Sequence, residues 1–386
     1  MTTLDDQRIA ALLRSAPVPE PHVDVDRAIR DGRRRRQRRR VGGFATVTVL
    51  AGLAAVGTVQ LGGVAGEPAP VPPALAASPT VSVSTAPARL TCAASMLPQP
   101  ILGPVAVATG VDPTGRHIVG DIGTGNEDGR VVLWTDGRAK VLPATARHGA
   151  AVNAGGYVVG TNGDGTGWVY RGGSLRFLTT PPGYDAVLVH AVNGRGDIAG
   201  TARGANDSHR AVLWSVDRPQ QYRLLGRPGS AATGITEDGT VVGTSGDSPY
   251  RWTPQGVGVA LAVPDGYPRA SVDSARGNWA IGMVPGAERD GAVRMLPVRW
   301  NLTTGAANLL PFPSANGIAG NGDLLVGDTE PLIVASDGTS RRLPGRPEVP
   351  TGAGTYTANG ISDDGRTVVG AVYENEAYRP LVWRCT

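Results

Sequence analysis

One sequence pattern recurs seven times along this chain of 386 residues. Each copy starts at a β-branched residue, passes through a turn rich in Asp, Asn and Gly, and continues into a short apolar run that ends in glycine. A turn of this composition between two apolar runs is typical of a β-hairpin. The copies read VDPTGRHIVG, VNAGGYVVG, VNGRGDIAG, ITEDGTVVG, VDSARGNWAIG, IAGNGDLLVG and ISDDGRTVVG, and they end at Gly120, Gly160, Gly200, Gly243, Gly282, Gly327 and Gly370.

A third apolar segment follows each hairpin after a loop of variable length. It carries a tryptophan at one equivalent position in five copies, and Tyr170 and Val334 take that position in the second and sixth copies. A further turn leads to a fourth apolar segment, so four strands occupy about 40 residues, which is the size of a β-propeller blade. The tryptophans are Trp134, Trp214, Trp252, Trp300 and Trp383.

The repeats therefore predict an all-β fold, a seven-bladed β-propeller of four-stranded blades. The composition agrees, because 55 Gly and 31 Pro suit many short strands joined by tight turns. The predicted repeats are 105–144, 148–184, 185–229, 230–267, 268–313, 314–350 and 351–386.

The two ends of the repeat array are expected to meet. The seventh copy stops after its third strand, and residues 91–100 contain a segment that supplies a fourth, which would close the ring and remove its open edges. Cys92 and Cys385, the two cysteines of the chain, lie at these ends. A disulfide between them is predicted outside the cytoplasm, with two unpaired thiols as the alternative.

The repeats resemble those of the HAF-type extracellular repeat family, whose units also pass through a glycine-containing turn to an aliphatic-Leu-Trp strand. The resemblance covers residues 91–386, although the sixth copy lacks the aromatic residue. It implies an exported, propeller-like domain and brings no ligand or catalytic residue with it.

The N-terminal part predicts a membrane anchor. Residues 41–66 form an uncharged segment that is long enough to cross a bilayer. The block Arg33–Arg40 precedes them, so the positive-inside rule places residues 1–40 in the cytoplasm and the propeller outside. The predicted parts are an Arg-rich stub at 1–40, a single transmembrane helix at 41–65, a Pro/Ala/Ser-rich linker at 66–90 and the propeller at 91–386. A cleaved signal peptide and a buried core helix are the alternatives for the apolar segment.

The charge distribution argues against a nucleic-acid ligand for the propeller. Residues 1–40 hold eleven Arg and six acidic residues, and the rest of the chain is nearly neutral. Binding to a phosphate backbone requires a basic excess that residues 91–386 do not have.

The sequence contains no convincing catalytic, cofactor-binding or metal-binding motif. The histidines lie far apart, without the spacing of a zinc site. NGDGT at 162–166 is faintly like a calcium loop but lacks the final bidentate acid, and SDDGRT at 362–367 is one residue short of a sialidase Asp-box. Both are interpreted as hairpin turns. The histidines are His22, His117, His148, His190 and His209.

The leading hypothesis is a binding or scaffolding module, tethered to the plasma membrane, that is not an enzyme and needs no cofactor. Its partners would be the bilayer through 41–65 and an extracytoplasmic protein or glycan. The longest loop between second and third strands, Met283–Pro297, is the first place to expect a binding surface. One alternative is a transmembrane signalling protein whose residues 1–30 hold a cytoplasmic regulator such as a sigma factor. The other is a propeller hydrolase or lyase, because fold alone does not exclude an activity.

Overall fold

The computed structural model describes residues 91–123, 129–289, 292–327, 330–346 and 355–386. Every regular element within these ranges is a β-strand. None of the described residues forms a helix long and apolar enough to cross a membrane. The predicted stub 1–40, transmembrane helix 41–65 and linker 66–90 lie outside the described part of the chain.

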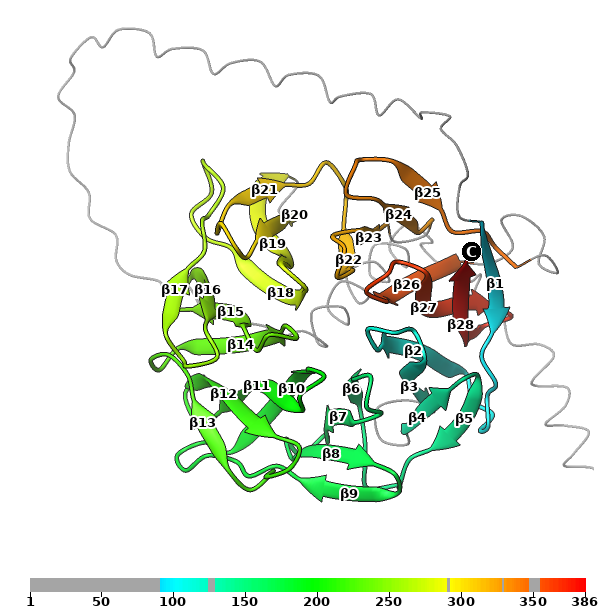
Figure 1. Ribbon diagram of the computed structural model, residues 1–386, viewed down its shortest axis with the longest axis horizontal. Helices are drawn as coiled ribbons and strands as arrows, with labels where there is room; N and C mark the ends of the chain where they lie inside the picture. Colours follow the sequence, from blue (N-terminus) through cyan, green and yellow to red (C-terminus); the bar gives the residue numbers. More distant parts are fainter. Residues whose placement is uncertain (1–90, 124–128, 290–291, 328–329, 347–354) are drawn as a thin grey trace, which may run out of the picture. The chain divides into compact units, whose positions relative to one another are not determined.

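Five antiparallel sheets of four strands stand alone, and they correspond to the second to sixth repeats. The chain runs outward through each of them, from the innermost strand to the outermost (Figure 1). These blades are β6 (Gly149–Val152), β7 (Val158–Thr161), β8 (Gly167–Arg171) and β9 (Ser174–Phe177); β10 (Ala186–Val192), β11 (Asp197–Arg203), β12 (His209–Ser215) and β13 (Tyr222–Leu224); β14 (Ser230–Ile235), β15 (Val241–Ser245), β16 (Ser248–Trp252) and β17 (Gly258–Ala260); β18 (Ser271–Arg276), β19 (Trp279–Arg289), β20 (Ala292–Asn301) and β21 (Ala307–Leu309); and β22 (Ala315–Ile318), β23 (Leu324–Val326), β24 (Leu332–Val334) and β25 (Ser340–Arg342).

The first and seventh repeats share one eight-stranded sheet. Tyr378 and Val105 join its two halves through a single parallel pair, and the Tyr378 N–H donates a hydrogen bond to the Pro104 carbonyl oxygen at 2.8 Å. This sheet contains β26 (Thr355–Ile361), β27 (Thr367–Glu374), β28 (Ala377–Cys385) and β1 (Cys92–Met96) on one side, and β2 (Val105–Val111), β3 (His117–Gly123), β4 (Arg130–Thr135) and β5 (Arg138–Val141) on the other.

The fold is thus an all-β propeller, but the prediction of seven separate blades is wrong: the described residues form five separate four-stranded blades and one larger sheet. The physical reason is the length of β28, whose first residues run beside the start of β2 and pair with it. A sequence repeat defines the strands but not whether two neighbouring sheets become hydrogen-bonded to each other.

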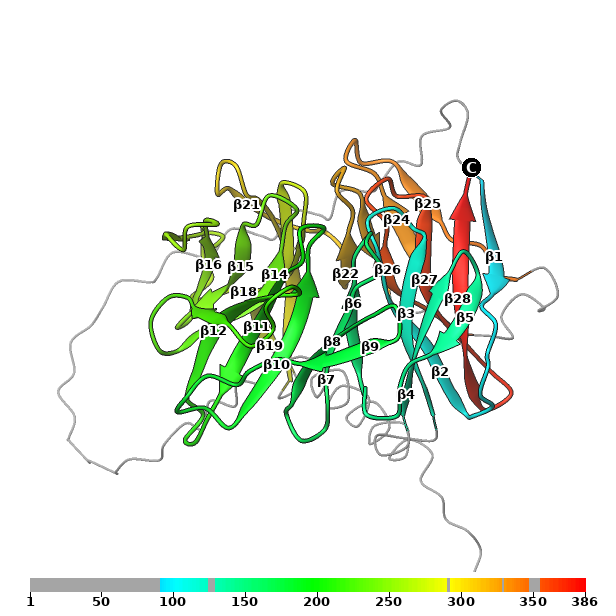
Figure 2. The ribbon, with the colours of Figure 1, turned by 60° about the horizontal axis from the view of Figure 1, so that its bottom comes forward.

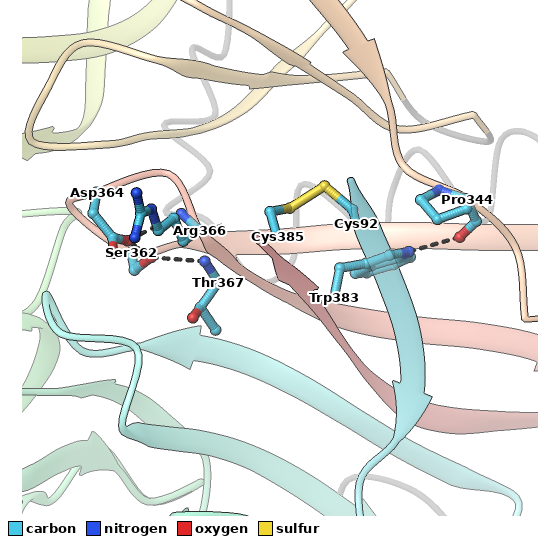
Figure 3. Close-up of a disulfide and its surroundings, with 8 residues drawn as sticks. All are labelled: Cys92, Pro344, Ser362, Asp364, Arg366, Thr367, Trp383 and Cys385. Atoms are coloured by element: carbon cyan, nitrogen blue, oxygen red, sulfur yellow. Dashed lines mark hydrogen bonds between the residues drawn. A yellow bond between two sulfur atoms is a disulfide. The ribbon is translucent and has the colours of Figure 1, made fainter. Parts of the chain in front are cut away.

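The N-terminal strand closes the ring. β1 pairs antiparallel with β28, with Cys92 opposite Cys385, and a disulfide joins these two residues across 293 positions of sequence (Figure 3). The backbones of Thr91 and Thr386 exchange two hydrogen bonds of 3.0 Å just beyond it. The predicted disulfide is confirmed, and β1 occupies the edge of β28 that would otherwise be open.

The repeat glycines allow the second strand of a repeat to approach the first. A Cβ atom added at Gly200 would lie 2.3 Å from the Leu188 carbonyl oxygen and 3.1 Å from the Trp214 ring. Five other repeat glycines meet a carbonyl oxygen at 2.3 Å or less in the same way, and only Gly327 is different, with a φ of +90°. Glycine is therefore required here for space. The five are Gly120, Gly160, Gly243, Gly282 and Gly370.

The repeat tryptophans are buried and fix the segment that leads into their own blade. The Trp214 indole N–H donates to the Thr179 carbonyl oxygen at 2.9 Å, and Trp383 donates to Pro344 at 2.8 Å (Figure 3). Trp134 and Trp300 make the equivalent bond, whereas the buried Trp252 indole nitrogen has no hydrogen-bond partner among the described residues.

The second repeat uses a different tryptophan for this role. Tyr170 takes the predicted position in the register, opposite Val158. It is Trp168, two residues earlier, that packs against Gly160 and donates a 2.9 Å hydrogen bond to the Arg147 carbonyl oxygen. The sixth repeat has Val334 at this position, buried in a smaller cluster.

Candidate functional site

The innermost strand of every repeat contains a β-bulge at the same place. In each case the register skips one residue. In six repeats the skipped residue follows the residue opposite the repeat glycine, and in the sixth it follows Ala315, which lies opposite Val326. A bulge redirects a side chain and is frequent next to functional sites. The innermost strands surround the centre of the ring (Figures 1 and 2). We call the seven bulged residues, one from each innermost strand, the axial ring. Its members are Thr109, Ala150, His190, Thr233, Asp273, Asn316 and Asn359.

Three members of the axial ring connect neighbouring repeats. The Thr233 hydroxyl donates to the Val272 carbonyl oxygen at 2.6 Å, and the Asn359 amide donates to the Ala108 carbonyl oxygen at 2.9 Å. Thr109 makes the same kind of bond to Gly149. Each acceptor is the residue just before the next bulge, so these polar side chains have a structural role.

His190 and Asp273 are different from the rest of the ring. The Nε2 atom of His190 is buried and has no hydrogen-bond partner among the described residues. Burial, with a smaller contribution from the positive charge of Arg203, lowers the pKa of His190 to about 4. Burial raises the pKa of Asp273 to about 6, only partly offset by the hydrogen bond that the Ser271 hydroxyl donates to it at 3.3 Å.

These two shifts favour the neutral form of both groups. Between about pH 4 and 6, His190 is a neutral base and Asp273 retains its proton. Titratable groups whose environments change their pKa in this way are the usual marks of acid–base chemistry. Neither residue was predicted as a site residue from the sequence.

The face of the ring that carries the hairpin turns between first and second strands is crossed by Arg276. Its guanidinium forms an ion pair with Asp363 at 2.9 Å and donates to the Val111 carbonyl oxygen at 2.6 Å. Arg276 is the last residue of β18, Asp363 lies just after β26, and Val111 is the last residue of β2. The contact therefore joins the fifth repeat to the seventh and first repeats and passes the blade β22–β25 between them. This strut ties three repeats together at that face.

The longest variable loop is largely regular structure. Residues 283–289 extend β19 and residues 292–297 belong to β20, and the two strands pair along this length, with Pro285 opposite Met295. Val293 and Met295 expose their side chains. Among the described residues no group of three His, Cys, Asp or Glu could hold a metal ion, in this hairpin or elsewhere.

The two rejected motifs are hairpin turns. In SDDGRT the Ser362 hydroxyl donates to Asp364 at 2.6 Å and accepts the Thr367 N–H at 2.9 Å (Figure 3). In NGDGT the Asp164 carboxylate accepts the Thr166 N–H at 2.9 Å. These bonds are those of Asx and Ser/Thr turns.

A sequence signal for the axial ring does exist. In six repeats the bulged residue stands two positions before the last paired residue of the innermost strand, in TGV, AAV, HAV, TGI, NGI and NGI. In the fifth repeat, DSAR, it stands three positions before it. Extending the repeat alignment by two residues would have revealed a polar column at this position. In the fifth repeat the alignment must also shift, because Ala275 and not Val272 is equivalent to Val111.

No protein-family model matches the sequence, and no curated protein matches it. Solved structures do match. Streptogramin B lyase has a TM-score of 0.51 at 16% identity, covering 76% of this chain and 98% of that one. Virginiamycin B lyase from Staphylococcus aureus has a TM-score of 0.50 at 16% identity, covering 76% and 99%. A puromycin hydrolase has a TM-score of 0.48 at 17% identity, covering 69% and 50%.

At this identity the likeness establishes the fold, a β-propeller, and not a substrate. It does correct the prediction that the domain is not an enzyme, because the fold is shared with lyases. That prediction rested on the absence of catalytic motifs from the sequence. Side chains at the axis of a propeller come from separate repeats, so they form no short sequence motif.

Proposed function

We propose that the propeller is a hydrolase or lyase whose acid–base pair is His190 and Asp273. The observation that carries the proposal is the pair itself: two titratable residues at equivalent axial bulges, with pKa values of about 4 and about 6. The shared fold with streptogramin B lyase and virginiamycin B lyase supports it.

The roles follow from the preferred protonation states. Neutral His190 has a buried imidazole nitrogen without a hydrogen-bond partner among the described residues. A substrate has to displace the groups that cover this atom before the nitrogen can accept a proton from it. Asp273 keeps its proton below about pH 6 and can donate it to a leaving group. The rate should therefore follow a bell-shaped pH profile, with limbs near pH 4 and pH 6.

The test incubates the full chain in detergent micelles with virginiamycin B and with a panel of ester, lactone and glycoside substrates, and follows the products by mass spectrometry. Elimination within a cyclic substrate leaves its mass unchanged, whereas hydrolysis adds one water. His190→Gln and Asp273→Asn should each lower the rate by at least about 100-fold. Thr233→Ser, which keeps the bond to Val272, is the control. Turnover of none of these substrates, or full activity in Asp273→Asn, contradicts the proposal.

The proposal places this enzyme outside the cell, on a membrane tether. Residues 41–65 would span the plasma membrane, with residues 1–40 in the cytoplasm and the propeller held outside by the linker 66–90. The uncharged segment and the Arg block support this topology, and a disulfide at the ring closure suits an oxidising compartment. Protease treatment of intact cells should digest a C-terminal tag and spare an N-terminal one.

The repeats support two finer proposals. In the eight-stranded sheet, one half contains the four strands of the first repeat, and the other contains the three strands of the seventh repeat together with β1. A single pair joins the halves, so they would act as two blades and bring the ring to seven units. The repeat pattern supports membership of the HAF-type family.

Residues 1–30 would bind a cytoplasmic regulator, and a pull-down from membranes with and without these residues tests that interaction.

A further inference from the structure

A second candidate site lies on the variable-loop face of the second repeat, away from the axial ring. The turn 162–166 between β7 and β8, the segment 144–147 that leads into β6, and the outer strand β9 surround an open cleft of about 550 Å³. This volume is typical of small-ligand sites. All residues that line the cleft belong to the second repeat or to the segment that leads into it.

Phe177 provides the apolar wall of the cleft. Its side chain is 44% exposed, and it lies opposite Trp168 in the outer strand pair. In every repeat, the equivalent residue of the outermost strand lies opposite the third-strand residue that stands two positions before the repeat-tryptophan position. In the other six repeats this outermost-strand residue is not aromatic. The repeat pattern therefore does not require an exposed aromatic ring here. The equivalent residues are Met96, Val141, Leu224, Ala260, Leu309 and Arg342.

The opposite wall of the cleft is polar and balanced in charge. It contains Asp164, Asn162, Thr166 and Arg147, and the Arg147 guanidinium donates to the Gly129 carbonyl oxygen at 2.7 Å. The Asn162 side-chain oxygen accepts the backbone N–H of Arg147 at 3.0 Å, and one Asp164 oxygen accepts the backbone N–H of Thr166 at 2.9 Å, so these bonds fix the conformation of the turn.

This combination of groups defines the ligand. The positive charge of Arg147 near the turn disfavours a bound cation, and the negative charge of Asp164 disfavours a phosphate. Planar carboxylate and amide groups suit pairs of hydroxyls, and the face of an aromatic ring attracts electropositive C–H groups. A sugar ring presents both surfaces at once.

We propose that this cleft binds a neutral pyranose unit of a glycan, with one face of the sugar stacked on Phe177. Asp164 and Asn162 then hydrogen-bond to neighbouring hydroxyls from the other side. The site is independent of the proposed activity, because it shares no residue with the axial ring.

The experiment measures binding of chitohexaose, cellohexaose and maltohexaose to the full chain in detergent micelles by isothermal titration calorimetry. At least one of the three should bind, and Phe177→Ala should weaken its binding by about tenfold or more. Asp164→Asn, which keeps the turn hydrogen bond, should also weaken it. The matched control is Leu309→Ala, because Leu309 is the exposed residue at the equivalent position of the fifth repeat.

Thermal unfolding of each variant separates binding from folding. Binding of no glycan, or an equal loss in Phe177→Ala and Leu309→Ala, overturns the proposal. Asp273→Asn should bind the glycan as the wild type does, so loss of turnover and loss of glycan binding are distinguishable outcomes.

Discussion

Replacing Asp273 by asparagine should stabilise the propeller at neutral pH while removing the proposed acid. The side chain lies at an axial bulge, and its one hydrogen bond comes from the Ser271 hydroxyl. Asparagine has nearly the same shape and keeps an oxygen that can accept this bond. The substitution therefore removes the ionisation and little else.

The magnitude follows from the pKa. Burial raises the pKa of Asp273 from 3.8 to about 6, a difference of about 2.2 units, and each unit corresponds to about 1.36 kcal/mol. A raised pKa in the folded state favours folding below the pKa of the unfolded chain, and this advantage is lost as pH rises through 6. Ionised Asp273 thus costs roughly 3 kcal/mol of unfolding free energy above pH 6, and Asp273→Asn does not carry this cost.

The measurement is denaturant unfolding of wild type and Asp273→Asn between pH 3.5 and pH 8, followed by fluorescence of the buried tryptophans. At pH 3.5 the two proteins should differ little, because the wild-type carboxyl is protonated in the folded state and mostly protonated in the unfolded state. The difference should grow in favour of the variant to about 3 kcal/mol at pH 7. A difference that is the same at every pH would refute the reasoning, because it would come from packing and not from ionisation.

Three further outcomes are expected. In the wild type, the free energy of unfolding should fall by about 3 kcal/mol as pH falls from 6.5 to 4, because the folded state holds the His190 imidazole neutral. His190→Gln should remove this dependence, which denaturant unfolding at several pH values measures. Gly200→Ala should lower stability by about 1–3 kcal/mol or more, since its Cβ would meet the Leu188 oxygen, whereas Gly137→Ala has open space and only backbone strain to overcome. The double variant Cys92→Ser with Cys385→Ser should lose about 2–5 kcal/mol, with thermal unfolding under reducing and oxidising conditions as the readout.

The repeat pattern predicted the strands because it reports local chemistry. A turn followed by an apolar run specifies a hairpin wherever it occurs, and the glycine before the tryptophan strand specifies a close approach that no Cβ permits. The disulfide was predictable because two cysteines at the ends of a closed array must meet. Trp168 was missed because the alignment fixed on Tyr170, while the ring that fills the space comes from two residues earlier.

The candidate site was beyond this reasoning for a different reason. His190 and Asp273 belong to repeats three and five, and only the bulges bring both to the axial ring. Their pKa shifts arise from burial, which depends on the packing of whole repeats. The single pair between Val105 and Tyr378 is also a long-range contact, and it decides that the first and last repeats share a sheet.

The ring closure determines how this domain would carry a mechanical load. The chain enters the first strand and leaves the last one side by side, with the backbones of Thr91 and Thr386 hydrogen-bonded to each other. A pull on the chain before Thr91 reaches Cys92 at the next residue, and the covalent bond passes it directly to Cys385 and β28. Traction on a tether would then be borne by a sulfur bridge at the edge of the fold. The hydrogen bonds between β1 and β28 would remain outside the path of the force.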